Sequence, residues 1–174
     1  VKGENVVLSI ITVPLTGECF TAIHGGGAQR NGAPIHVCDP PSGQLKDTVV
    51  VLSRRANDAE IVRHAAIYAA MADPQKGART LRVLNSAAGD FVRLAHGRTH
   101  ASIHNGANAY DVLPGMLLVR EAGGTVTDFS GNAVRLPAVT GEISADDLRD
   151  TPIDIVMAAP GIHAALVQRL AQLA

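Results

Sequence analysis

The segment from Tyr110 to Gly124 constrains the fold of this chain more than any other. Asp111 opens an apolar run with helical spacing, and the run stops at Gly123 and Gly124. Asp111 stands where an N-cap is expected, Pro114 falls in the expected first turn, and the two glycines supply the C-terminal stop. The pattern predicts a helix that fixes one carboxylate at its positively polarised end, as suits a metal ligand. An ordinary capped helix is the alternative interpretation.

Length and charge narrow the class of protein. The 174 residues fit a single domain spanning 1–174, whose core must be aliphatic because aromatic residues make up only 3% of the chain. A formal net charge of −1 gives no electrostatic reason to expect a nucleic-acid partner or an anionic membrane. No apolar run approaches the ~20 residues of a membrane span, and no signal-peptide pattern is visible. Cys19 and Cys38 are expected to be reduced thiols, so a soluble cytoplasmic protein is predicted.

Strand patterns dominate the first part of the chain and alternate with helical patterns later. Strands are expected at 6–13 and 19–24 as a hairpin, and then at 35–37, 48–52, 79–84, 99–103, 125–128 and 153–158. Helices are expected at 86–96, at 160–173 and from Asp58, the last with Ile61, Val62, Ala65, Ala69 and Ala70 as apolar positions. An irregular polar segment is expected at 132–150. The alternation predicts a largely parallel or mixed sheet with helices on its faces.

Four stretches carry, in order, a resemblance to a known family. They are Phe20–Ile35, Arg82–Ala88, Tyr110–Gly124 and Ile155–His163. The first of them contains the sequence Phe-Thr-Ala and three consecutive glycines. Together they resemble the successive motifs of the inositol monophosphatase family. The resemblance covers nearly the whole chain and implies an α/β fold, the C-terminal part of that family's layered α/β/α/β/α sandwich with mixed sheets flanked by helices. The chain then corresponds to the C-terminal two-thirds of such a phosphatase.

The resemblance also implies a Mg²⁺-dependent phosphomonoesterase that acts on a phosphorylated small molecule. The family carries its metals on an upstream Glu-Glu pair and an Asp-Pro-(Leu/Ile)-Asp-Gly-Thr segment. In this chain, neither Asp39-Pro40 nor Asp73-Pro74 is followed by the Asp-Gly-Thr of that segment. Asp111 is the one carboxylate that matches a family metal ligand. A lone carboxylate binds Mg²⁺ weakly, because the ion requires several oxygen ligands. The chain alone is therefore expected to be catalytically incompetent.

Two further places match the family's substrate contacts. Asn85, Ser86 and Ala87 correspond to a loop that contacts the substrate polyol, and Asn85 replaces the glycine that usually opens it. This loop begins a helix whose backbone N–H groups could receive a hydroxyl or a phosphate, although Ser86 could simply cap the helix. His104 stands where inositol-type members have an acidic residue that contacts substrate hydroxyls. A neutral imidazole can still form a hydrogen bond but supplies no fixed anion.

Two clusters of histidine and cysteine are candidate metal sites. His100, Ser102 and His104 alternate and would share one strand face, so they could bind zinc with His96 or be exposed strand residues. The second group, Cys19, His24, His36 and Cys38, lacks zinc-finger spacing.

Two functions remain open from the sequence. The first is an active phosphatase whose missing carboxylates come from another chain or from a further N-terminal segment, with Asp111 binding Mg²⁺. The second is a non-catalytic binding or interaction protein built on the same scaffold. Loss of upstream elements would uncover apolar faces and a sheet edge, so a homodimer or other homo-oligomer is expected.

Overall fold

The computed structural model describes residues 6–54, 58–134 and 152–173. One sheet is antiparallel, with strand order β1 (Leu8–Val13), β2 (Glu18–Ile23), β3 (Gly27–Arg30) and β4 (Ala33–Pro34). The other sheet is mixed, with strand order β6 (Thr80–Arg82), β5 (Val49–Arg54), β7 (Ala101–Asn108), β9 (Pro152–Ala158) and β8 (Thr125–Thr127). The α-helices are α1 (Asp58–Met71), α2 (Ala87–Ala95), α3 (Ala109–Glu121) and α5 (Pro160–Ala171).

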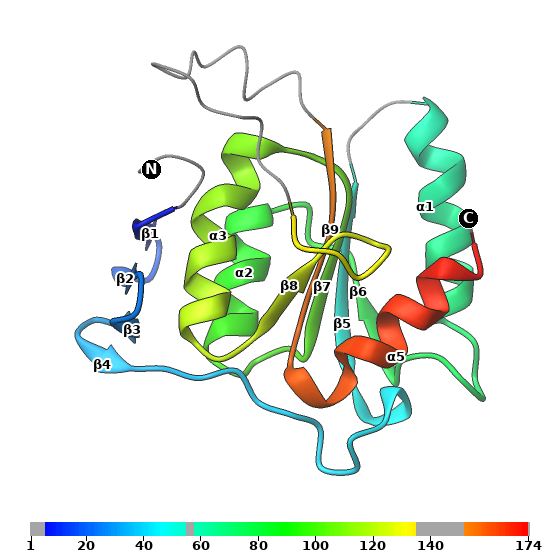
Figure 1. Cartoon of the computed structure of the whole chain (residues 1–174), viewed down its shortest axis with the longest axis horizontal. Coiled ribbons are helices and arrows are strands. Elements are labelled where there is room, and N and C mark those ends of the chain that lie inside the picture. The colour runs from blue at the N-terminus through cyan, green and yellow to red at the C-terminus, as the bar shows by residue number, and fades with distance from the viewer. Residues whose placement is uncertain (1–5, 55–57, 135–151, 174) are drawn as a thin grey trace.

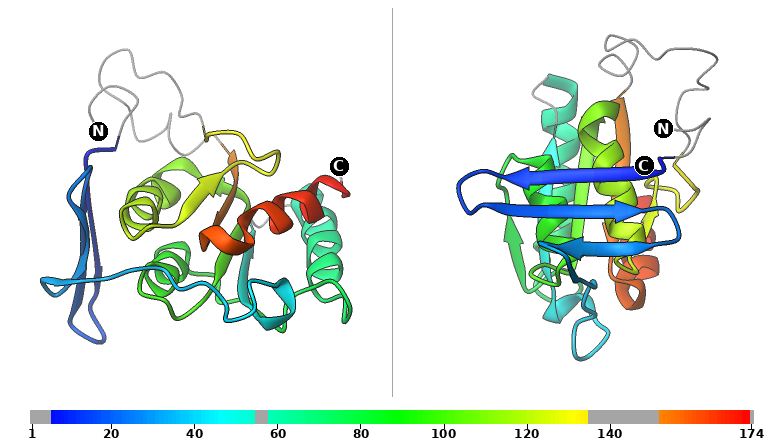
Figure 2. Two further views of the ribbon diagram at one scale, coloured as in Figure 1. Left: turned by 60° about the horizontal axis from the view of Figure 1, so that its bottom comes forward. Right: turned by 90° about the vertical axis from the view of Figure 1, so that its left-hand side faces the viewer.

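These elements form successive layers (Figure 1). The antiparallel sheet packs on α2 and α3, these helices pack on the mixed sheet, and α1 and α5 cover the far face of that sheet. Figure 2 shows the antiparallel sheet edge-on and face-on, with its outer face turned away from the helices. The layered α/β fold with mixed sheets and flanking helices confirms the fold class predicted from the sequence.

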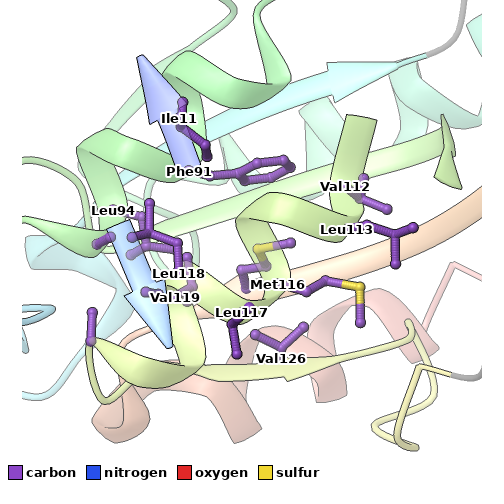
Figure 3. Close-up of a cluster of buried hydrophobic side chains, with 14 of the residues drawn as sticks. Ile11, Phe91, Leu94, Val112, Leu113, Met116, Leu117, Leu118, Val119 and Val126 are labelled. Carbon is purple, nitrogen blue, oxygen red and sulfur yellow. The ribbon is translucent and has the colours of Figure 1, made fainter. Parts of the chain in front are cut away.

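The core lies on both faces of the mixed sheet. Between the two sheets, Phe91 of α2 packs with Val112, Met116 and Leu118 of α3 (Figure 3), and all four side chains are buried. On the other face, Ile67 and Met71 of α1 join the cluster formed with α5, β5, β7 and β9. Burying each such side chain contributes roughly 1.5–3 kcal/mol. The elements that carry the predicted site are therefore held between two hydrophobic layers.

Strand β7 carries a β-bulge near its end. Its antiparallel register with β9 shifts between His104 and Ala107, and Gly106 adopts a φ of 66° within the shift. The Gly106 N–H donates to Asp154 Oδ1 on β9 at 2.9 Å, and Asp154 Oδ2 pairs with Arg63 of α1. Bulges bend a strand and redirect its side chains, so this contact sets how the end of β7 enters α3.

Helix α3 begins earlier than the sequence predicted. Its N-cap is Asn108 and its first residue is Ala109, so Asp111 lies within the first turn and the prediction of Asp111 as N-cap is wrong. Pro114 consequently lies in the second turn, not in the first. The reason is that β7 runs directly into the helix without an intervening loop. The predicted stop is confirmed, because Gly123 has a φ of 88° and donates its N–H to the Arg120 carbonyl.

Most of the other elements lie close to their predicted positions. The buried face of α1 was predicted wrongly: Ile61 and Val62 are 44% and 74% exposed, whereas Ile67 and Met71 are buried. The strand expected at 35–37 is absent from the described residues, and the sequence analysis predicted neither β3 nor β4. The expected irregular segment falls largely on 135–151, outside the described residues. In the described part of the chain, every helix is too short or too polar to span a bilayer.

Candidate functional site

A cleft of about 590 Å³ opens where the N-terminus of α2, the end of β7 and the first turn of α3 meet. All five residues predicted to form the site line this cleft: Asn85, Ser86, Ala87, His104 and Asp111. Its other lining residues are Ser53, Ala88, Gly106, Ala107 and Asn108. The fold thus brings together the five predicted residues, which lie up to 26 positions apart in the sequence, from Asn85 to Asp111.

The loop before α2 is shaped by two side chains. Asn85 adopts a φ of 53°, the left-handed conformation that glycine favours and that asparagine tolerates better than most residues. Asn85 can therefore form a turn that a glycine would also form. Ser86 is the N-cap of α2, and its hydroxyl accepts the Gly89 N–H at 3.3 Å. The N-terminus of α2, where backbone N–H groups favour anions, thus forms one wall of the cleft.

Asp111 contacts the residue that caps its own helix. Asn108 Nδ2 donates to Asp111 Oδ2 at 3.3 Å and to the Tyr110 hydroxyl at 2.9 Å. Asn108 Oδ1 is buried, and no donor from the described residues reaches it; a cation or a donor from a ligand stabilises a buried oxygen of this kind. Asp111 is the only acidic side chain among the described residues that line the cleft.

Asp111 and Asn108 supply oxygen ligands suited to Mg²⁺, but only part of a coordination shell. The described ranges contain no group of three or more histidine, cysteine, aspartate or glutamate side chains that could hold a metal. The two alternative metal clusters therefore find no support in this part of the chain. His100 instead accepts the Val49 N–H through Nδ1 at 3.0 Å, which ties β7 to β5.

His104 is buried, not exposed as a solvated strand histidine would be. Its side chain is 1% exposed, and its Nε2 lies 2.7 Å from Ser102 Oγ. The ring also stacks at a tilt against Phe91, with 4.7 Å between the ring centroids. Burial lowers the pKa of His104 to about 3, so the imidazole is neutral at physiological pH.

Asp90 is the functional candidate that the sequence reasoning missed. Its side chain is fully buried, Oδ2 lies 3.8 Å from His104 Nε2, and neither carboxylate oxygen accepts a hydrogen bond within the described residues. Burial raises the pKa of Asp90 to about 7, and the positive charge of Arg93 partly opposes this rise. One signal was available: Asp90 shares helical spacing with the apolar Ala87 and Leu94, which places it on the buried face of α2.

Comparison with known proteins agrees with this fold. The family model described as the inositol monophosphatase family matches residues 1–172. The chain is 37% identical over 125 residues to the Nus factor SuhB of Xylella fastidiosa, which covers 71% of this chain and 43% of that protein. It is 30% identical over 130 residues to the inositol-1-monophosphatase of Mesorhizobium japonicum, covering 75% of this chain and 47% of that protein.

Solved structures give the same result. The extragenic suppressor protein suhB of Bartonella henselae superposes with a TM-score of 0.74 at 26% identity, over 95% of this chain and 57% of that one. The Thermotoga maritima IMPase superposes with a TM-score of 0.73 at 25% identity, over 98% and 57% respectively. The chain spans about half the length of the curated relatives that it matches. With its ordered motifs, its layered fold and a family match along almost its entire length, the chain belongs to the inositol monophosphatase family.

Proposed function

We propose that this chain supplies the substrate-binding side of a Mg²⁺-dependent phosphomonoesterase site, for a phosphorylated small molecule that carries hydroxyl groups. The observation that supports this proposal is the convergence of Asn85–Ala87, His104 and Asp111 on a single cleft. These segments correspond to the polyol-contacting loop, the hydroxyl-contacting position and one metal-ligand position of the family. Relatives named inositol monophosphatase have the same fold.

Each wall of the cleft has a distinct role in this proposal. The N-terminal amides of α2 receive an oxygen of the ligand, because the helix dipole and the free N–H groups favour negative charge there. His104 hydrogen-bonds a ligand hydroxyl. Asp111 offers a carboxylate oxygen to a metal. Bound Mg²⁺ in such a site polarises the phosphoryl oxygens and lowers the pKa of coordinated water.

The chain alone is proposed to bind its ligand without hydrolysing it. A single acidic side chain lines the described cleft, and Mg²⁺ sites usually combine carboxylates with water and substrate phosphate. The remaining carboxylates would come from another part of a longer protein or from another chain. The second candidate function is non-catalytic binding on the phosphatase scaffold. The presence of a single acidic side chain in the described cleft favours this function as well.

The experiment measures binding and turnover separately. Mg²⁺ and inositol 1-phosphate are titrated by calorimetry into the chain, the Asp111→Ala variant and the control variant Asp47→Ala, whose carboxylate lies away from the cleft. Phosphate release is measured on the same samples. Ligand binding that needs Mg²⁺ and Asp111, with no turnover, supports the proposal.

The other outcomes decide between the candidates. Turnover that Asp111→Ala abolishes and Asp47→Ala preserves would show a complete phosphatase and overturn the incompetence of the single chain. Binding that ignores both Mg²⁺ and Asp111 would support a non-catalytic binding protein. If neither Mg²⁺ nor the phosphate ester binds, the cleft is not a substrate site.

We also propose that the outer face of the antiparallel sheet is covered by a second copy of the chain. Leu8, Ile10 and Ile23 are 54%, 58% and 60% exposed, and Leu8 pairs with Ile23 across β1 and β2. Strand β1 is also an edge strand, with backbone groups open to pairing. Sedimentation velocity at micromolar concentration should show a dimer that Ile10→Lys dissociates, with Leu15→Lys as a matched exposed control. A monomer would contradict this.

A further inference from the structure

Two polar side chains approach the same nitrogen of His104. Ser102 Oγ lies 2.7 Å from Nε2, and Asp90 Oδ2 lies 3.8 Å from Nε2. This geometry excludes a serine-protease type of relay, in which serine and aspartate contact different nitrogens of the imidazole. Ser102 is also fully buried, so no substrate carbonyl can reach its hydroxyl. The cluster must act through His104.

The other ring nitrogen is left for a ligand. Nδ1 of His104 has no hydrogen-bond partner among the described residues, and His104 is one of the residues that line the cleft. A neutral imidazole has one N–H and one lone pair, so the partner of Nε2 decides what Nδ1 presents. If Nε2 carries the proton, Nδ1 is an acceptor. If Nε2 is the acceptor, Nδ1 is a donor.

We propose that Asp90 is a positioning residue that holds the proton of His104 on Nε2, so that Nδ1 accepts a hydrogen bond from a ligand hydroxyl. The proposal rests on the function proposed above and names the group that its ligand must offer at this wall. A proton on Nε2 has two possible acceptors nearby, Ser102 Oγ at 2.7 Å and Asp90 Oδ2 at 3.8 Å. A movement of about 1 Å brings Asp90 within ordinary hydrogen-bond distance.

Two physical facts favour Nε2–H. A buried carboxylate that lacks any donor is costly, and Nε2 of His104 lies 3.8 Å from Asp90 Oδ2, where a proton on Nε2 offsets that cost. The hydroxyl of Ser102 can accept as readily as it donates, so it imposes no tautomer by itself. The carboxylate can only accept once it is ionised. Asp90 therefore determines the direction of the hydrogen bond, and Ser102 adapts to it.

The expected ligand chemistry follows. An acceptor at Nδ1 binds a hydroxyl group and has no favourable contact with an ether or carbonyl oxygen. The cleft should therefore discriminate against a phosphate ester in which that hydroxyl is replaced by hydrogen or by an O-methyl group. An acidic residue at this position would make the same selection through a charge, whereas His104 makes it through tautomer choice alone.

The test uses ¹⁵N-histidine-labelled full chain at pH 8, about one unit above the pKa of Asp90. Long-range proton–nitrogen spectra report which ring nitrogen is protonated, and His104→Gln assigns the signals. We expect His104 with Nε2 protonated in the parent chain and in Ser102→Ala. In Asp90→Asn, which keeps the side-chain shape, at least a several-fold rise in the fraction with Nδ1 protonated is expected. Equal spectra in the parent chain and Asp90→Asn, or Nδ1–H in the parent chain, would overturn the proposal.

A titration then tests the ligand contact independently of turnover. Addition of inositol 1-phosphate with Mg²⁺ should shift the Nδ1 signal of His104, while methyl phosphate, which offers no hydroxyl on its carbon, should not. Equal shifts with both esters would reject the hydroxyl contact. The two proposals can fail separately. If calorimetry detects no binding of the phosphate ester, but His104 still carries its proton on Nε2 and still depends on Asp90 for this, the proposed function is wrong and the role of Asp90 stands.

Discussion

Gly115 of α3 lies directly beneath the aromatic ring of Phe91 on α2, so close that a Cβ at position 115 would overlap the ring carbons. The ring of Phe91 in turn contacts the imidazole of His104. The absence of a side chain at one helix position therefore sets the distance between α2 and α3 and the packing behind the cleft.

The first prediction concerns this contact. Gly115→Ala should destabilise the chain by about 3 kcal/mol, because the added methyl group forces Phe91 and its helix outward in a packed core. Phe91→Leu in the same chain should recover part of the loss. Urea unfolding of the two single variants and the double variant measures the coupling. Additive effects would show that the two residues do not interact.

The second prediction concerns the pH dependence of stability. The pKa of Asp90 is raised from 3.8 to about 7, so its stabilising contribution is complete below about pH 4 and is lost as the pH rises towards 7. The pKa of His104 is lowered from 6.5 to about 3, so its contribution to stability increases as the pH rises from about 3 to 6.5 and is lost in acid. The two slopes oppose each other between about pH 4 and 6.5.

Variants separate the two contributions. Asp90→Asn should show an unfolding free energy that rises with pH in this window, and His104→Gln one that falls, each by up to about 1.4 kcal/mol per pH unit. The parent chain should be nearly flat by comparison. Urea unfolding at several pH values checks the signs. Parallel curves for the two variants would contradict the assigned burial of the pair.

The third prediction concerns Glu121 at the end of α3. Its two carboxylate oxygens accept the N–H groups of Gly25 and Gly27 at 2.8 and 2.9 Å, which ties the turn between β2 and β3 to the helix. Glu121→Ala should cost about 2 kcal/mol, and Glu121→Gln about half of that because one acceptor oxygen remains. Hydrogen exchange at the two glycine amides should accelerate in the order parent, Gln, Ala. Unchanged exchange rates at the two glycine amides would contradict the hydrogen bonds between Glu121 and this turn.

The fourth prediction concerns the bulge in β7. Asp154→Ala removes the acceptor of the Gly106 N–H and should destabilise the chain by about 1–2 kcal/mol while weakening ligand binding in the cleft. Arg63→Ala removes the exposed partner of that carboxylate together with the contact of Arg63 over the Phe129 ring, and it should cost about 1 kcal/mol with little effect on binding. Thermal unfolding and calorimetry compare the two variants. If both variants lose ligand binding to a similar extent, the ion pair between Arg63 and Asp154 controls the bulge instead.

Local patterns were sufficient to predict the elements that carry the site. The capped helix at 86–96, the glycine stop after α3 and the order of strands and helices all depend on residues adjacent in sequence. Asp111 lines the cleft, but its prediction as an N-cap is wrong, because no local signal shows that β7 continues to Asn108. That continuation depends on pairing with β9, which lies more than 40 residues later.

Tertiary packing decided what the sequence left open. Helix α1 is rich in alanine, so several of its faces are similarly apolar, and its contact with β5 and β7 selects Ile67 and Met71 for burial. Strand β3 is polar and glycine-flanked, and it forms through backbone pairing with β2. The sequence did not indicate a functional role for Asp90, because its burial beside His104 depends on the tertiary structure. A charged residue in a helix pattern is usually a solvated one.

The neutrality of His104 has a consequence for how the cleft responds to its surroundings. Ionic strength screens attraction to a carboxylate, whereas a hydrogen bond to an uncharged imidazole carries little net charge to be screened. Selection of a hydroxyl at this wall should therefore persist at high salt, even as any attraction of the phosphate group to the rest of the cleft weakens. Raising the salt concentration would then lower affinity for all ligands alike and leave their ranking unchanged.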